Sequence, residues 1–177
     1  SWRRSTGNSP NSALRSTRDM APRSILKRFG LTGLVAIIVA RFDRSLNSPC
    51  RLKAPDGEVR DRIWIGNFGE RVACAWLRSQ GCKVLARNYR GPRRGEVDII
   101  ARDRKLLLFV EVKTRREGSR IRGLDAVDKE KQGLIERGAN SWLKRLGTRD
   151  LPWRFDVIEV SVAEGQKPRI NHVKDAF

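Results

Sequence analysis

The sequence has few residues that could build a thiol or imidazole site. Its 177 residues include one histidine, His172, and three cysteines, none of which form a Cys-x-x-Cys pair. Structural zinc sites use clustered Cys and His, and disulfide frameworks use even sets of cysteines, so the sequence argues against both. Free thiols are typical of a reducing compartment, which favours the cytoplasm.

Negative charge is also scarce. Thirty-eight Lys and Arg stand against twenty Asp and Glu, which gives a formal net charge of +18. Residues 1–60 contribute +8 and residues 61–177 contribute +10, so the excess is not confined to a tail. This balance indicates a polyanionic partner, either nucleic acid or an anionic membrane surface, with a merely soluble basic protein as the alternative.

No clear transmembrane segment is present. The most apolar stretch, residues 31–40, is shorter than the roughly 20 residues that span a bilayer, and no small-x-small cleavage site follows it. A surface-docking helix is therefore favoured over a secretory signal. Residues 1–24 have no apolar periodicity and predict disorder, and residues 47–58 read as a linker. We predict a basic, largely disordered extension over 1–60 and a folded domain over 61–177.

The folded part alternates between helical and strand patterns. Apolar residues at helical spacing predict a helix over 67–80, with Gly81 as its C-terminal cap, and a second helix within 124–147. Strands are expected at residues 82–90, 96–103, 105–115, 153–162 and 169–177, the second and third forming a hairpin. This order predicts a small α/β domain with a mixed β-sheet flanked by helices.

The third predicted strand ends in charges that a buried strand does not need. A continuous apolar run over 106–110 is followed by Glu111 and Lys113 on alternate positions. If the hairpin turn is Asp103-Arg104, Asp98 lies opposite Phe109 and diagonal to Glu111, with Cα atoms about 7–8 Å apart. A turn of odd length would place Asp98 on the other face.

Two carboxylates followed by a lysine are what metal-assisted phosphodiester hydrolysis needs. Asp98, Glu111 and the carbonyl of Val112 are candidate ligands for Mg²⁺ or Mn²⁺, and the Lys113 ammonium is a candidate to orient a water molecule. Glu70 could support this site, although the helix dipole alone explains an acid in a first helical turn. A single Glu-x-Lys is most often a solvated strand face, so the hypothesis depends on the conjunction.

At these residues the sequence resembles a known superfamily. Aspartate followed by Glu-x-Lys on a hairpin is similar to the PD-(D/E)xK superfamily of restriction-endonuclease-like nucleases and Holliday junction resolvases. More closely, "GNFGERVACAWLRSQG", "RNYRGPRRGEVDIIARD", "FVEVKTR", "AVDKEKQ", "RFDVIEV" and "INHVKDAF" resemble, in this order, the bacterial YraN family of predicted endonucleases. The resemblance covers residues 66–177.

This resemblance implies a restriction-endonuclease-like core with four catalytic residues: Glu70, Asp98, Glu111 and Lys113. Glu96 and Lys131 also fall within the motifs but receive no role. The chain has Val97 at the position of the proline in the PD-(D/E)xK pattern. It also differs from the family in having about 60 residues before the first motif.

Arginines flank the proposed site on both sides. They are candidates for two phosphate-binding rims, with a solvated loop surface as the alternative reading. The nucleic-acid-binding candidates are Arg87, Arg90, Arg93, Arg94, Arg115 and Arg116. Of the remaining polar residues, His172 is a candidate general base but more often would make a structural hydrogen bond, and Asp156 is expected to pair with Arg154 or a neighbouring arginine.

Three functional hypotheses follow. The first is a Mg²⁺-dependent nuclease acting on DNA, on branched or damaged intermediates of repair or recombination. The second is a non-catalytic nucleic-acid-binding protein on a nuclease fold, and the third is a membrane-surface protein anchored through residues 31–40. The sequence does not distinguish DNA from RNA as the substrate, or endonuclease from exonuclease action. It also leaves open whether one or two metal ions bind and whether the protein is a monomer or a homodimer.

Overall fold

A computed structural model describes residues 37–38, 43–118, 128–147 and 150–177. The predicted disorder of residues 1–24 and most of the apolar stretch 31–40 therefore lie outside the described residues. Among the described residues, none of the helices combines the length and the apolar character that crossing a bilayer requires.

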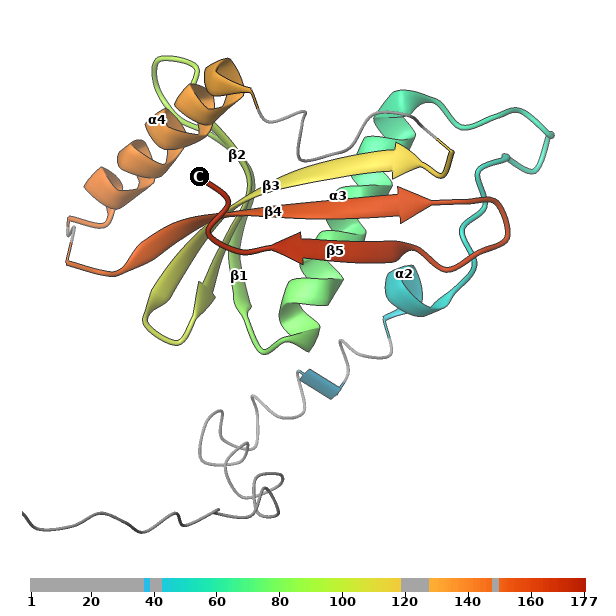
Figure 1. Cartoon of the computed structure of the whole chain (residues 1–177), viewed down its shortest axis with the longest axis horizontal. Coiled ribbons are helices and arrows are strands. Elements are labelled where there is room, and N and C mark those ends of the chain that lie inside the picture. The colour runs from blue at the N-terminus through green and yellow to red at the C-terminus, as the bar shows by residue number, and fades with distance from the viewer. Residues whose placement is uncertain (1–36, 39–42, 119–127, 148–149) are drawn as a thin grey trace, which may run out of the picture.

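Five strands form one mixed sheet in chain order (Figure 1). Only β3 and β4 are parallel; the other neighbouring pairs are antiparallel. The strands are β1 (Lys83–Arg90), β2 (Glu96–Asp103), β3 (Leu106–Arg116), β4 (Trp153–Val162) and β5 (Arg169–Val173). The predicted α/β class with a mixed sheet and flanking helices is confirmed, and the arrangement is consistent with a restriction-endonuclease-like core.

Helix α3 (Arg62–Ser79) begins earlier than the predicted start at residue 67. Asp61 caps it, because its side chain accepts a hydrogen bond from the Trp64 amide at 2.7 Å. The predicted C-terminal cap is confirmed: Gly81 has a φ of 85°, and its amide donates to the Arg78 carbonyl. The predicted start was wrong because the early turns contain glycines, which weaken the helical pattern.

Two hydrophobic layers lie on opposite faces of the sheet. Leu108 and Val110 of β3 pack with α3, whereas Leu107 and Phe109 pack with α4 (Lys129–Arg145). The apolar run of β3 is therefore covered on both faces, as its sequence predicted. Helix α4 also makes the crossover that the parallel β3–β4 pair requires.

Some of the described residues before position 61 pack against the domain. Helix α2 (Arg44–Asn47) contributes Leu46 to the α3 layer, and Cys50 and Leu52 are buried there. Cys50 also exchanges two backbone hydrogen bonds with the β4–β5 turn, one with Gln166 and one with Gly165. The expectation of a linker is wrong at these positions.

The β2–β3 hairpin has a different register from the one predicted. Asp103 pairs with Leu106, so the turn is Arg104-Lys105, and the ladder runs to Ile99 opposite Val110. The predicted register is wrong by two residues. Because this shift is even, every side chain stays on its predicted face.

A buried polar network ties the last two strands together. Asp156, whose side chain is 0% exposed, accepts hydrogen bonds from Arg154 at 2.8 Å, His172 at 2.9 Å and the Asp175 amide at 3.0 Å. Burial alone would raise the pKa of Asp156, but these hydrogen bonds outweigh it and hold the pKa below its usual value. The predicted pairing with Arg154 is confirmed, and His172 makes a structural hydrogen bond.

Asp156→Asn is expected to lower the free energy of unfolding at pH 7 by about 3 kcal/mol, because a buried ion pair loses one partner. A carboxyl with a lowered folded-state pKa stabilises the fold above its unfolded pKa of about 3.9 and loses that contribution as pH falls through the folded value. Urea unfolding between pH 7 and pH 2 measures both effects. If the variant lost stability with falling pH as steeply as the unaltered protein, this assignment would be contradicted.

Candidate active site

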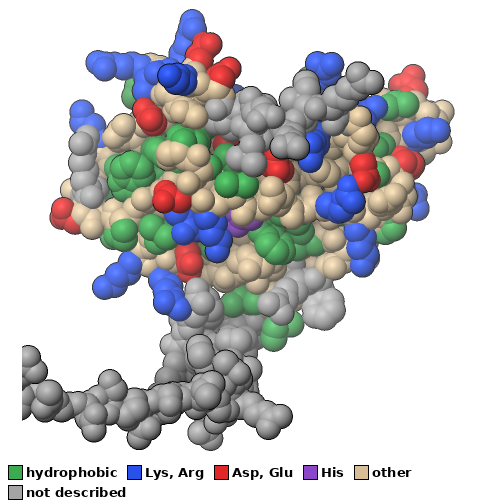
Figure 2. Space-filling view, viewed as in Figure 1, with side chains coloured by type: hydrophobic (Ala, Val, Ile, Leu, Met, Phe, Trp, Pro, Cys, Tyr) green, Lys and Arg blue, Asp and Glu red, His purple; other side chains and the backbone are tan. Residues whose placement is uncertain are grey.

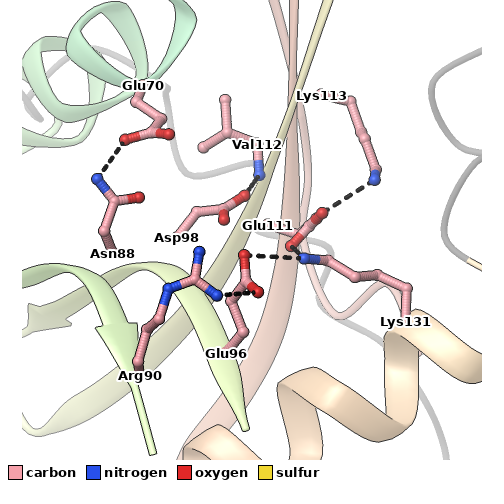
Figure 3. A network of polar contacts seen from close by, with 9 residues as sticks. All are labelled: Glu70, Asn88, Arg90, Glu96, Asp98, Glu111, Val112, Lys113 and Lys131. Carbon is pink, nitrogen blue, oxygen red and sulfur yellow. Dashed lines mark hydrogen bonds and ion pairs between the residues drawn. The ribbon is translucent and has the colours of Figure 1, made fainter. Parts of the chain in front are cut away.

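The candidate site lies where β2 and β3 stop pairing. The last backbone pair is Ile99 with Val110, and β3 continues beyond it. The Val112 amide donates instead to Oδ2 of Asp98 at 2.8 Å (Figure 3). The carboxylate of Asp98 thus accepts the hydrogen bond that a backbone carbonyl of β2 would otherwise accept from β3. This hydrogen bond fixes the carboxylate between the two strands.

Glu111 places a second carboxylate beside Asp98. The two residues immediately follow the last ladder pair, so they lie opposite each other rather than diagonally as predicted. Glu111 is 3% exposed, and its Oε1 is 2.9 Å from Nζ of Lys113. The prediction that Asp98, Glu111 and Lys113 lie on one side of the strands agrees with these contacts.

The two carboxylates interact unfavourably. Burial, and then the neighbouring charge of Glu111, raise the pKa of Asp98 to about 7. The Val112 amide and the Lys131 ammonium act in the opposite direction but are outweighed. A partly buried carboxylate beside the buried carboxylate of Glu111 attracts a cation or a proton.

Lys131, to which the sequence gave no role, contacts the acids of this site. Its Nζ is 3.3 Å from Oε2 of Glu111 and 3.6 Å from Oε1 of Glu96. The cap of α4 holds it there, because Asp128 accepts a hydrogen bond from the Lys131 amide at 2.8 Å. Arg90 lies 2.6 Å from the other oxygen of Glu96. The motif "AVDKEKQ" was the only sequence signal for Lys131, since its partners lie on distant strands.

Glu70 lies apart from this group. Its Oε2 accepts a hydrogen bond from Asn88 at 3.0 Å (Figure 3). The same oxygen is 3.4 Å from Nη2 of Arg87. The structure thus places Glu70 against β1 rather than in contact with the Asp98–Glu111 pair. Its supporting role stays a prediction.

The predicted phosphate-binding arginines fall into different environments. Arg87 and Arg90 pair with Glu70 and Glu96, and Arg94 is exposed. In Figure 2, Lys and Arg side chains gather over the α4 end of the molecule and, separately, at the end where β3 and β4 terminate. Arg93 belongs to a groove beside α4, and Arg115 and Arg116 belong to a groove beyond β3.

The groove beyond β3 has a volume of about 960 Å³ and lies between that strand and the start of α3. Arg60, Arg62, Arg115 and Arg116 line it together with two acids. Both acids are engaged, because Asp61 caps α3 and Glu117 pairs with Arg169. The groove is therefore cationic, and Thr114, the residue after Lys113, lines it on the α3 side of β3.

Comparison with known proteins gives the family. The sequence signature of the Uncharacterised protein family UPF0102 matches residues 69–160, a range that runs from α3 to β4. The chain belongs to the UPF0102 family. This is the YraN family that the motifs resembled, so that resemblance is confirmed. The family description names no activity.

Individual UPF0102 proteins match over nearly their whole length. The protein of Trichlorobacter lovleyi is 44% identical over 116 residues, which cover 64% of this chain and 89% of that protein. The protein of Geobacter sulfurreducens is 44% identical over 122 residues, or 69% and 94% of the two chains. That of Nocardia farcinica is 42% identical over 122 residues, or 67% and 93%.

The donor set of this UPF0102 chain fits a hard divalent cation. Among the described residues, no three His, Cys, Asp or Glu side chains gather to hold a metal by themselves. Asp98 and Glu111 supply two carboxylates, and Oε2 of Glu111 is buried and receives no hydrogen bond of good geometry from the described residues. Two carboxylates, a backbone carbonyl such as that of Val112, and water form a coordination set that Mg²⁺ accepts.

Gly69 sets the distance between α3 and β3 in this UPF0102 chain. A Cβ at Gly69 would lie 1.7 Å from Oγ1 of Thr114, whereas one at Gly66 would meet nothing within 4 Å. This close approach positions the neighbouring Glu70 beside the sheet.

Gly69→Ala is expected to lower the free energy of unfolding by about 1–3 kcal/mol, because the helix must move away from β3. Gly66→Ala is the matched control and is expected to be neutral or stabilising by up to about 1 kcal/mol. Urea denaturation of both variants checks the pair, and adding Thr114→Ala should restore part of the loss. Equal effects of the two glycine substitutions would show that the close approach does not matter.

Proposed function

We propose that this UPF0102 chain is a divalent-metal-dependent nuclease that hydrolyses phosphodiester bonds in DNA. The observation that carries the proposal is the convergence of Asp98, Glu111 and Lys113 where β2 and β3 separate. The net charge of +18 and the cationic groove next to Thr114 support a nucleic-acid substrate.

The proposed roles follow from what each residue already contacts. Asp98, Glu111 and the Val112 carbonyl hold the cation, whose charge, when it is bound, screens the phosphate and lowers the pKa of a coordinated water. Lys113 is oriented by its 2.9 Å ion pair with Glu111 and is only partly exposed. Its ammonium orients the water or offsets charge that develops on the phosphate.

Lys131 supplies positive charge to Glu111 from the opposite side. With Lys113 on one oxygen and Lys131 on the other, Glu111 is balanced in the absence of a divalent ion. Because Lys131 already contacts Glu111, its ammonium would compete with a cation held by Asp98 and Glu111. Lys131 therefore stabilises the folded state in which Asp98 and Glu111 lie together, and lowers the affinity of this pair for the ion.

The proposed substrates are branched or damaged intermediates of DNA repair or recombination. Phosphate contacts carry no sequence information, so the arginine-lined groove favours recognition of structure or of any sequence. The test is incubation of the full chain with linear, flapped and four-way DNA, with Mg²⁺, with Mn²⁺ and with a chelator. Products that require the metal and disappear in Asp98→Asn support the proposal, and metal-independent products would contradict it.

A second candidate function is non-catalytic nucleic-acid binding on the same fold. It is favoured by the ion pairing of the site, because Glu111 has a lysine on each oxygen and Glu96 and Glu70 each have an arginine partner. Such a site is balanced without a metal ion. This alternative expects DNA binding that weakens steeply with salt and yields no product with Mg²⁺ or Mn²⁺.

A further inference from the structure

A second cationic groove lies on the side of α4, against the β1–β2 turn. Its volume is about 520 Å³, and its lining has three cationic side chains, two neutral polar ones and no carboxylate. The lining residues are Pro92, Arg93, Arg137, Asn140, Ser141 and Lys144. The four residues from α4 recur at the spacing that places side chains on one stripe of a helix.

The turn that forms one wall of this groove has an unusual sequence for its shape. The Gly95 amide donates to the Pro92 carbonyl at 3.1 Å, and the residues between them, Arg93 and Arg94, have φ values of 54° and 60°. Positive φ at both central residues is the pattern of a type I′ turn, which Asn and Gly normally occupy. Two arginines in this conformation are strained, and strain of this kind concentrates at functional sites.

The turn is also held rigidly against α4. A Cβ at Gly95 would lie 2.6 Å from the backbone nitrogen of Gly138, so the two segments touch through their backbones. Nε of Arg137 donates to the Arg93 carbonyl at 3.1 Å, and the Tyr89 and Ser141 hydroxyls lie 3.0 Å apart. The groove is thus formed before any ligand arrives, which reduces the entropic cost of binding.

The cations of this groove differ in pairing from those near the acids. Within the described residues, no carboxylate forms an ion pair with Arg93, Arg137 or Lys144, whereas Arg87 and Arg90 are both paired. The helix dipole would account for Lys144, which is in the last turn of α4, but not for the two arginines. Hydrogen-bond donors that line a groove without carboxylates are complementary to the phosphate oxygens of a phosphodiester backbone.

We propose that this α4 groove binds the phosphate backbone of a DNA double helix, while another part of the same duplex reaches the Asp98–Glu111 pair. The identification of the ligand as DNA rests on the proposed function. Along α4, Arg137 is about 9 Å and Lys144 about 20 Å beyond Lys131, which contacts Glu111. For a duplex that runs along α4, a rise of 3.4 Å per nucleotide places the groove about three to six nucleotides from the cleaved bond. The substrate must therefore extend beyond that bond on the α4 side.

The first test measures DNA binding by the full chain in a chelator, where no cleavage occurs. Fluorescence anisotropy of a labelled DNA duplex of about 20 base pairs is followed over a range of salt concentrations. Arg137→Gln with Lys144→Gln is expected to weaken binding about tenfold and to reduce the salt slope by about two. The control, Arg102→Gln with Lys105→Gln, removes the same charge from exposed residues at the end of the β2–β3 hairpin and is expected to change affinity less than twofold.

The second test uses the strained turn. Arg93→Asn with Arg94→Gly gives the turn its preferred residues, so thermal stability is expected to stay the same or rise, while duplex affinity falls about fivefold. A purely structural turn would gain stability with unchanged affinity, and that result would overturn the proposal.

Other outcomes separate this inference from the proposed function. If duplex binding depended on the groove but the protein cleaved no DNA, the proposed nuclease activity would be contradicted and the proposed binding by the α4 groove would be supported. Equal losses in the groove pair and the control pair would show an effect of net charge alone and overturn the groove. Groove-dependent binding to phosphatidylglycerol vesicles but not to the duplex would also overturn it.

Discussion

Replacing Asp98 with asparagine is expected to stabilise the metal-free protein and to reduce metal-dependent cleavage at least about a thousandfold. Asparagine keeps an oxygen that can accept the 2.8 Å hydrogen bond from the Val112 amide. It removes the negative charge that Glu111 repels. We expect the free energy of unfolding at pH 8 to rise by about 2 kcal/mol, allowing for the partial exposure of the site.

The sign of this effect follows from the pKa. Burial and Glu111 raise the folded-state pKa of Asp98 to about 7, above the unfolded value of about 3.9. Such a group destabilises the fold progressively as pH rises from about 4 to about 7, and fully above that. The asparagine variant lacks this loss, so its advantage should be small at pH 4 and largest at pH 8.

Urea unfolding in a chelator at pH 4 and pH 8, beside a cleavage assay with Mg²⁺, measures both effects. Asp56→Asn, in an exposed loop, removes the same charge and is the matched control. Loss of stability in Asp98→Asn at pH 8, or cleavage at the rate of the unaltered protein, would contradict the assignment of Asp98 to a shared cation site.

Lys113→Ala is expected to lower the cleavage rate by about 10²–10³-fold while leaving duplex affinity within a factor of about two. The ammonium is 2.9 Å from Glu111 and acts at the reacting phosphate, whereas most of the binding energy comes from other cations. Lys113→Arg should recover only a small part of the rate, because a planar guanidinium cannot replace the compact ammonium.

The control for Lys113 is Lys105→Ala at the exposed β2–β3 turn, which should leave both properties unchanged. Single-turnover cleavage and anisotropy in a chelator separate the rate from the affinity. An unchanged rate in Lys113→Ala, or a fall in affinity that accounts for the whole loss of rate, would remove Lys113 from the catalytic group.

The strands, and the face on which Asp98, Glu111 and Lys113 lie, could be predicted from the sequence. The predicted bounds of β2 and β4 agree with the structure, because alternating or continuous apolar patterns bounded by turn residues are local signals. The register could not be fixed, since Asp103-Arg104 and Arg104-Lys105 are equally polar turns. Arg104 has a φ of 57°, a conformation that its residue type does not reveal.

Long-range partners could not be predicted. Residues 47–58 contain two prolines and a glycine and so resemble a linker, yet Cys50 bonds to the distant β4–β5 turn. Similarly, the sequence does not show that Lys131 reaches Glu111, or that Arg87 and Arg90 pair with acids. These contacts depend on how α4 and the strands are brought together, which residue patterns do not encode locally.

Calorimetric titration of the full chain with Mn²⁺ tests most directly whether the Asp98–Glu111 pair takes up a divalent ion. We predict saturable binding that is lost in Glu111→Gln and is about tenfold tighter in Lys131→Met, equivalent to about 1.4 kcal/mol. Absence of binding in the unaltered protein, or equal binding in Glu111→Gln, would contradict it.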